Sequence, residues 1–288
     1  MAIAKSALIL LQLIVFWGQS SQASLCSAES AFGQSPLFQE LNAKLLDPDF
    51  KVIVLGRHGK ASQENKFPAV ERNADPEKMR LDIARPLAKK GQRAATQLSE
   101  VMSLLQFREA GMWGSYALRV ESTARYTRDV LGERVKIYEF EQDLYYADVP
   151  AEMEQRLASE QGEALPHAFF WGHGKTTLAL FKKLTGATDG FLPTAAVMIV
   201  AMKAGSWEQV FSGGAEQVEA YAWSPNKSHE IIGSAAPVSM LESAGPELES
   251  VGGLESGMDL ELFLDDDDEG FDPTEDGDSQ SLESFVLR

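Results

Sequence analysis

Between residues 51 and 225, short apolar runs alternate with longer segments whose apolar residues recur at helical spacing. The short runs are rich in β-branched and aromatic residues, which is typical of buried strands. They cover residues 51–56 (KVIVLG), 111–116 (GMWGSY), 135–140 (VKIYEF), 167–172 (HAFFWG), 194–203 (TAAVMIVAMK) and 207–213 (WEQVFSG).

The longer segments predict helices. Residues 85–107 are the clearest case, because Ala94, Leu98, Val101, Met102 and Leu105 fall on one helical face. Pro86 suits the first turn of that helix, and Gly132 and Gly186 suit the ends of two later ones. Strands that alternate with helices indicate an α/β fold, a three-layer sandwich with a mostly parallel central sheet. The remaining predicted helices cover residues 117–133, 150–159 and 175–186.

The N-terminal segment has the pattern of a secretory signal peptide. Lys5 precedes an apolar run, and Ser21-Gln22-Ala23 has the small-x-small form of a cleavage site. The run is short for a bilayer-spanning helix, so we expect cleavage after residue 23 and no stable membrane insertion afterwards; an uncleaved anchor is the alternative. Residues 24–50 are then a leader or linker. We expect a secreted or secretory-pathway protein, or a plastid protein if Ala31-Phe32 marks a bipartite leader.

The C-terminal segment, residues 226–288, is predicted to be a disordered acidic tail. Residues 201–288 hold 3 Lys/Arg against 20 Asp/Glu, whereas residues 51–200 hold 21 against 19. Such a segment buries too little apolar surface to offset the entropy of ordering it, although its few apolar residues offer an alternative role as a binding motif. Strong acidity disfavours nucleic acid and anionic membranes as partners. We therefore expect the functional residues in the nearly neutral segment, residues 51–200.

The chain of 288 residues is 44% hydrophobic, enough for one sizeable core. Its single cysteine, Cys26, excludes a disulfide within the chain and gives no zinc-ligand spacing.

Two of the four histidines stand in the same local setting. His58 follows the apolar run at 51–56, and His173 follows the run at 167–172. Binding sites in open α/β sheets form at the carboxyl ends of strands. Two neighbouring parallel strands would bring both imidazoles to one rim of the sheet.

Two arginines add positive charge to that predicted rim. Arg57 directly precedes His58, and Arg119 lies where a helix follows a predicted strand. A guanidinium presents a planar fork of donors that matches phosphate oxygens. Two arginines and two histidines on one rim would therefore form a pocket for a phosphoryl group.

These residues lie in segments that resemble the histidine phosphatase superfamily, also called phosphoglycerate mutase-like, and within it the SixA-type phosphohistidine phosphatases. The resemblance implies that the fold is phosphoglycerate mutase-like, that His58 is a nucleophile, and that Arg57, Arg119 and His173 hold the phosphoryl oxygens. Six segments carry it in the family's order: VLGRHGKAS, LDIARPLAKKGQRAATQL, SYALRVESTA, DLYYAD, WGHGKTTLALFKKLTG and FLPTAAVMIVAMKAGSWEQV.

Three positions depart from the family pattern: Gly174 replaces the usual Asn, Tyr116 the common Pro, and Ser122 the common Gln. None is one of the four core positions, but Gly174 and Ser122 can alter the rim and thus the substrate. GHGKT is not a phosphate-binding P-loop, because Phe169 stands where that motif needs its first glycine.

A general acid is less clearly marked. Glu141 and Asp143 are candidates by position, against a role at a strand end, and Asp148 is weaker. SixA-type enzymes lack an obvious acid, and a phosphorylated imidazole is a better leaving group than an alkoxide. Asp82 and Arg85 are expected to form a helix-start or loop interaction, with lining of the pocket as the alternative. Lys60 is a candidate rim cation or a solvated lysine.

The sequence therefore predicts a phosphatase that needs no metal and no cofactor. It would hydrolyse a phosphomonoester or a phosphoramidate such as phosphohistidine, carried by a small molecule or a protein, through a phosphohistidine on His58. The alternatives are phosphoglycerate mutase-like transfer between hydroxyls, or an inactive module that binds a phosphorylated ligand.

Overall fold

A computed structural model describes residues 35–146, 148–187, 192–225 and 232–236. The predicted signal peptide, the plastid-type junction, Cys26 and all of the acidic tail except residues 232–236 lie outside these ranges and stay predictions. None of the helices within the described ranges is long and apolar enough to cross a membrane.

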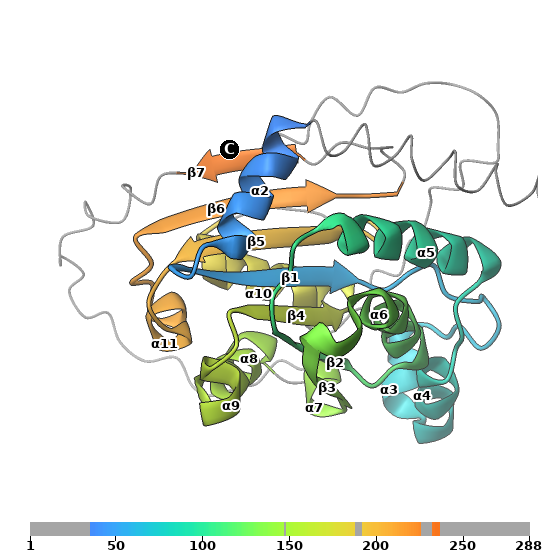
Figure 1. Cartoon of the computed structure of the whole chain (residues 1–288). Coiled ribbons are helices and arrows are strands. Elements are labelled where there is room, and N and C mark those ends of the chain that lie inside the picture. Colours follow the sequence, from blue (N-terminus) through green and yellow to red (C-terminus); the bar gives the residue numbers. More distant parts are fainter. Residues whose placement is uncertain (1–34, 147, 188–191, 226–231, 237–288) are drawn as a thin grey trace, which may run out of the picture.

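The centre of the molecule is a seven-stranded sheet with the order β3-β2-β4-β1-β5-β6-β7 (Figure 1). Strands β1, β2, β3, β4 and β6 run in one direction, and β5 and β7 run in the opposite one. The expected α/β fold with a mostly parallel sheet is confirmed. The strands are β1 (Phe50–Arg57), β2 (Ala110–Ser115), β3 (Val135–Glu141), β4 (His167–Gly172), β5 (Val197–Lys203), β6 (Gln217–Trp223) and β7 (Ile232–Ala236).

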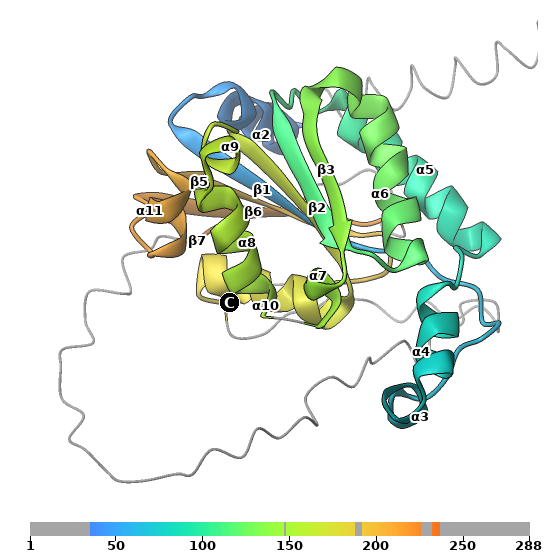
Figure 2. The same cartoon turned by 90° about the horizontal axis from the view of Figure 1, so that it is seen from below.

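Helices cover both faces of the sheet, which gives three layers (Figure 2). One face carries α2 (Pro36–Leu46), α5 (Lys89–Leu104) and α6 (Leu118–Leu131). The other carries α8 (Val149–Ala158), α10 (Gly174–Thr185) and α11 (Trp207–Phe211). The remaining helical segments are α3 (Ala69–Ala74), α4 (Pro76–Ile83), η1 (Gly132–Arg134), α7 (Asp143–Tyr146) and α9 (Glu160–Glu163).

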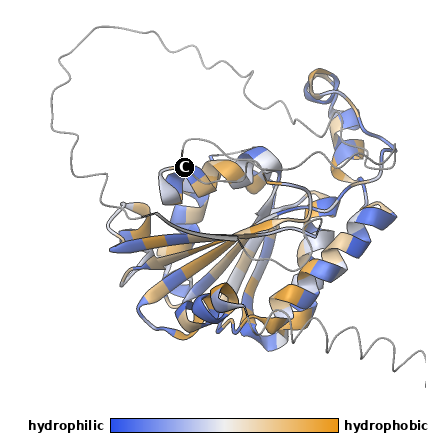
Figure 3. Cartoon of the chain, turned by 90° about the horizontal axis from the view of Figure 1, so that it is seen from above, coloured by the Kyte–Doolittle hydropathy of each residue, from blue (hydrophilic) through white to orange (hydrophobic). Residues whose placement is uncertain are grey.

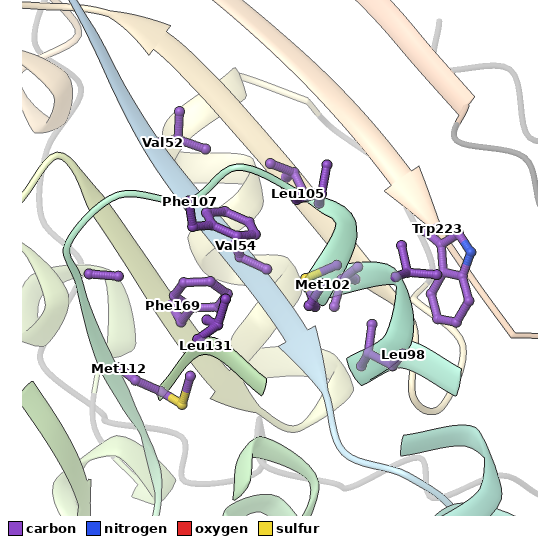
Figure 4. Packing of buried hydrophobic residues seen from close by; sticks show 14 of the residues in the cluster. Val52, Val54, Leu98, Met102, Leu105, Phe107, Met112, Leu131, Phe169 and Trp223 are labelled. Atoms are coloured by element: carbon purple, nitrogen blue, oxygen red, sulfur yellow. The ribbon is translucent and has the colours of Figure 1, made fainter. Parts of the chain in front are cut away.

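The side chains of β1 show why this strand is apolar throughout. Val52 and Val54 pack into the cluster beneath α5, and Figure 4 shows Val54 near Met102. Ile53 and Leu55 point to the opposite face and pack with α8 and α10. Successive strand residues face opposite sides of a sheet, so a strand covered on both faces loses the polar alternation. Figure 3 shows orange bands on the strands among pale and blue ones, and both orange and blue on the helices.

Two helices end at the glycines predicted from sequence, but one helix starts later than predicted. The chain leaves α6 at Gly132 and α10 at Gly186, with φ of 58° and 70°, a conformation that glycine adopts without a Cβ penalty. Helix α5 starts at Lys89, so Pro86 lies before it rather than in its first turn. Pro86 and its neighbours pair with the chain after His58 instead.

The described domain begins before residue 51, the boundary predicted from sequence. Helix α2, in the segment assigned to a leader or linker, buries Phe38, Leu41 and Leu45 against the sheet. These residues recur at a spacing of three and four, which places them on one helical face. At the other end, β7 pairs with β6 beyond the predicted boundary at residue 225.

The segment 207–213 was predicted to be a strand, and this is wrong. Residues 207–211 form α11, whose Trp207, Val210 and Phe211 are buried on one side. Ser206 caps the helix, because its side chain accepts a hydrogen bond from the backbone N–H of Gln209. The second closing strand is β6, further along the chain.

A buried histidine, His167, lies outside the predicted site. His167 is fully buried, where its Nδ1 accepts from the backbone N–H of Arg108 at 3.0 Å and its Nε2 donates to the Leu45 carbonyl at 3.1 Å. Both bonds suit the neutral ring. Burial, reinforced by the charge of Arg108, lowers the pKa of His167 from 6.5 to about 3.

We expect His167 to destabilise the fold as the pH falls. Between pH 6.5 and 3 the unfolded chain holds a proton on this ring that the folded chain does not. Stability is therefore full above pH 6.5 and falls by about 1.4 kcal/mol per pH unit below it. Urea unfolding of wild type and His167→Gln at several pH values measures this slope. An acid limb equally steep in the variant would contradict the prediction.

Candidate active site

The two predicted histidines lie side by side at one rim of the sheet. Strands β1 and β4 are parallel neighbours with Arg57 opposite Gly172, so the residues that follow them emerge together. The ring centroids of His58 and His173 are 5.1 Å apart, in an edge-to-face arrangement. The backbone N–H of His58 also donates to the Gly172 carbonyl at 3.2 Å. The juxtaposition predicted from the two apolar runs is present.

A main-chain contact determines which nitrogen of the His58 ring carries the proton. Its Nδ1 lies 2.8 Å from the carbonyl oxygen of Gly59. A carbonyl oxygen can only accept, so Nδ1 carries the proton. In the neutral ring, Nε2 then bears the lone pair, which is the form that a nucleophilic imidazole requires.

Arg119 lies in the first turn of α6 and is fully buried. One hydroxyl joins this turn to the histidine loop: Thr123 Oγ1 accepts from the Gly59 N–H at 2.9 Å and donates to the Arg119 carbonyl at 2.7 Å. The start of α6 and the residue after His58 are therefore held together through one side chain.

Arg57 ends β1, directly before His58. Its Nη1 donates to the Leu192 carbonyl at 2.9 Å. Its guanidinium packs against Gly174, where a Cβ would lie 3.4 Å from the guanidinium carbon. Gly174 is the first residue of α10, so Arg57 lies beside a helix N-terminus, where backbone N–H groups favour anions.

His173 lies between several side chains at the same rim. Its Nε2 is 3.4 Å from the hydroxyl of Ser115, which ends β2. The Tyr145 ring meets it edge-on at 4.7 Å, and Tyr116 in turn meets Tyr145 at 5.9 Å. Tyr116, one of the departures from the family pattern, thus belongs to an aromatic group next to His173. Ser122, another of these departures, lies in α6 and is half-buried.

The chain after His58 is held by the segment before α5. Ala61 and Leu87 form an antiparallel bridge. Ser62 donates to the Pro86 carbonyl at 2.8 Å, and Ala88 donates to the Lys60 carbonyl at 2.9 Å. Lys60 itself is half-buried two residues from His58. This segment thus fixes the loop that carries the candidate nucleophile.

The two candidate acids share one arginine. Arg156 Nη2 lies 2.7 Å from a Glu141 oxygen and 2.6 Å from an Asp143 oxygen. Partial burial acts to raise the pKa of Asp143, but the hydrogen bond and charge of Arg156 outweigh it and lower that pKa. A carboxyl group with a lowered pKa is a poor proton donor near neutral pH. The weaker candidate, Asp148, is exposed beside α8.

Asp82 lies in the last turn of α4 and Arg85 in the loop after it, so their contact is a loop interaction and not a helix-start one. Both are buried and form an ion pair, and Arg119 forms a second ion pair with the same Asp82 carboxylate. Sequence analysis did not identify Arg72, which joins the same group from α3. The only local signal was the i, i+3 spacing of Asp82 and Arg85, which cannot show contacts with distant segments.

Within the described ranges, no three His, Cys, Asp or Glu residues gather as metal ligands. His58 and His173 lie together at the rim, and the Arg57 guanidinium lies beside Gly174. Arg119 enters from the first turn of α6, with its guanidinium on Asp82. Such a set can supply a nucleophile and can neutralise phosphoryl oxygens.

Comparison with known proteins gives matches among solved structures alone. No family model matches the sequence. No curated protein matches it either. A protein from Nakamurella multipartitia described under the name phosphohistidine phosphatase SixA is 20% identical, with a TM-score of 0.44, and the match covers 58% of this chain and 92% of that one.

Two other matching structures have similar coverage. The protein histidine phosphatase SixA, complexed with tungstate, is 18% identical with a TM-score of 0.42 over 57% of this chain and 92% of that one. A mycobacterial glucosyl-3-phosphoglycerate phosphatase is 12% identical with a TM-score of 0.36 over 53% and 91%. All three are similar to this chain at low identity over a little more than half of its length.

Proposed function

We propose that this chain is a histidine phosphatase that hydrolyses a phosphoramidate or phosphomonoester through a phosphohistidine on His58. One observation carries the proposal. The Nδ1 of His58 faces the Gly59 carbonyl, which leaves Nε2 as the nucleophilic nitrogen, at a rim shared with His173. Arg57 and Arg119 lie on the segments that adjoin this histidine.

The reaction has two displacements at phosphorus. In the first, the lone pair of His58 Nε2 forms a bond to phosphorus as the bond to the leaving oxygen or nitrogen breaks. In the second, water attacks phosphorus, inorganic phosphate leaves and the neutral ring returns. Positive charge builds on the imidazole in the intermediate, and the Gly59 carbonyl next to Nδ1 stabilises it. Arg57, Arg119 and His173 offset the charge on the phosphoryl oxygens.

The surroundings favour a substrate whose leaving group needs little help from an acid. Arg156 holds both Glu141 and Asp143, and it lowers the pKa of Asp143. A phosphorylated imidazole meets this condition, because an imidazole leaves more readily than an alkoxide. We therefore place phosphohistidine, in a protein or a small molecule, ahead of sugar or glycerate phosphates.

The test is to trap the intermediate. The chain, treated with EDTA, is incubated briefly with a ³²P-labelled phosphoramidate and quenched in alkali. We expect a stoichiometric covalent label that acid removes, together with released inorganic phosphate. A chain that binds phosphate but never takes up label would be a binding module. Label that passes to glycerate in preference to water would indicate a mutase.

The destination of the chain is a separate proposal. The N-terminal pattern favours the secretory route, with a plastid as the alternative, and it rests on residues outside the described ranges. A fluorescent tag placed after residue 288 would report the compartment. Retention in the cytosol with an intact N-terminus would contradict a cleaved leader.

A further inference from the structure

A buried carboxylate joins three arginines next to the proposed phosphate site. Asp82 is fully buried near the C-terminal end of α4. Its Oδ1 lies 2.7 Å from Arg85 Nη1, and its Oδ2 lies 2.9 Å from Arg72 Nη1. The same Oδ2 lies 3.3 Å from Arg119 Nη2. Since both oxygens are engaged, the carboxylate has little freedom to rotate.

Arg119 meets Asp82 at two points. Its Nη2 faces the carboxylate, and its Nη1 donates to the Asp82 main-chain carbonyl at 2.8 Å. That carbonyl belongs to the last turn of α4, where it also accepts from the Arg85 N–H at 3.2 Å. The carbonyl end of a helix attracts cations. A planar guanidinium held through both terminal nitrogens has a fixed orientation. Asp82 thus sets the direction in which the rest of the Arg119 fork points.

The same group links a separate part of the chain to the site. Arg72 belongs to α3 and Asp82 to α4, and Figure 2 shows this helix pair standing apart from the layers, near the lower end of α6. The sequence separation between Asp82 and Arg119 is 37 residues. The ion pair with Arg72 therefore ties α3 to α4, and the contacts with Arg119 join α4 to the first turn of α6.

We propose that Asp82 is a positioning residue of the phosphoryl-transfer reaction, acting through Arg119. This inference rests on the proposed function of His58 and Arg119. Transition-state stabilisation depends more steeply on geometry than ground-state binding does. A displaced Arg119 should therefore slow turnover more than it weakens substrate binding.

The first test is Asp82→Asn, which keeps the size and the main-chain carbonyl but removes the charge. We expect kcat for para-nitrophenyl phosphate to fall by about tenfold or more, while KM changes by less than about threefold. The affinity for orthovanadate, which resembles the transition state, should fall in parallel with kcat. Glu77→Gln removes a carboxylate from the exposed face of the same helix and is the matched control, with wild-type kcat.

A double-mutant cycle separates positioning from a general loss of structure. Arg119→Ala is combined with Asp82→Asn, and vanadate affinity and kcat are measured for all four chains. If Asp82 acts through Arg119, its replacement costs nothing further once Arg119 is absent. Losses that multiply would overturn the proposal. If thermal unfolding shows that the Asp82→Asn chain is not folded, Asp82→Glu takes its place in the cycle. That variant keeps the charge and shifts the carboxylate by one methylene.

The cycle also remains informative if the proposed function fails. A wild-type chain that binds vanadate but hydrolyses neither phosphoramidates nor phosphate esters would contradict the phosphatase proposal alone. In that case the vanadate affinities still show whether Asp82 acts through Arg119. A folded Asp82→Asn chain with wild-type kcat and vanadate affinity would overturn the role of Asp82 whatever the reaction.

Discussion

Replacing His58 with alanine is expected to abolish hydrolysis, with a fall in kcat/KM of about a thousandfold or more. The variant removes the nitrogen that bonds to phosphorus, so no covalent intermediate can form. The surrounding arginines remain and still bind oxyanions, so phosphate affinity should change far less than turnover. Steady-state hydrolysis of para-nitrophenyl phosphate and the ³²P trapping assay measure the two effects.

Chemical rescue distinguishes a lost nucleophile from a distorted fold. Added imidazole can enter the space left in the His58→Ala variant and accept the phosphoryl group in place of the side chain. We expect rescue that grows with imidazole concentration and rises with pH as the free imidazole loses its proton. An unfolded variant would show no rescue. Wild-type activity in a folded His58→Ala chain would rule out the phosphohistidine route.

The sequence could predict the central part of this site because it depends on backbone order. His58 and His173 each follow an apolar run, and parallel strands deliver such residues to one rim. The sequence does not show which strands are neighbours, but a chain that alternates strands and helices allows few arrangements of the sheet. Arg57 and Arg119 came from the same reasoning combined with the family resemblance.

Other features depend on side chains that meet from distant segments. Arg72, Asp82 and Arg119 come from three helices, and no local pattern shows that their charges converge. The engagement of Glu141 and Asp143 by Arg156 was equally hidden, although it changes what those carboxylates can do. Short elements are also hard to assign from the sequence. The helix at Trp207 spans 5 residues, too few for its helical period to stand out from a strand.

The second large effect is expected from Gly91, the glycine in the segment that follows Pro86. Gly91 lies in the first turn of α5, where its backbone packs directly on the loop after His58. A Cβ here would lie 2.2 Å from the Lys60 carbonyl oxygen and 2.8 Å from the Lys60 nitrogen. These are main-chain atoms, so no rotamer change can relieve the contact. Gly59 is close on the other side, where its own Cβ would meet the Gly91 carbonyl at 2.8 Å.

Gly91→Ala therefore sets two effects against each other. Alanine in a helix gains about 1 kcal/mol over glycine, whereas overpacking costs typically 1–3 kcal/mol and more when backbone must move. Because the clash is with main chain, we expect net destabilisation of about 2 kcal/mol. The loop must also shift, which displaces His58 and should lower kcat by about tenfold or more. Thermal unfolding and hydrolysis of para-nitrophenyl phosphate measure both changes.

The control for Gly91→Ala is Thr96→Ala, at an exposed position of the same helix. It gains helix propensity without a new contact, so its stability should stay within about 0.5 kcal/mol of wild type and its kcat unchanged. The comparison decides what the glycine does. If Gly91→Ala is as stable and active as Thr96→Ala, the close approach of α5 to the His58 loop is wrong. If stability falls but kcat holds, the contact supports the fold without orienting the nucleophile. Loss of both is the result expected if this packing sets the position of His58.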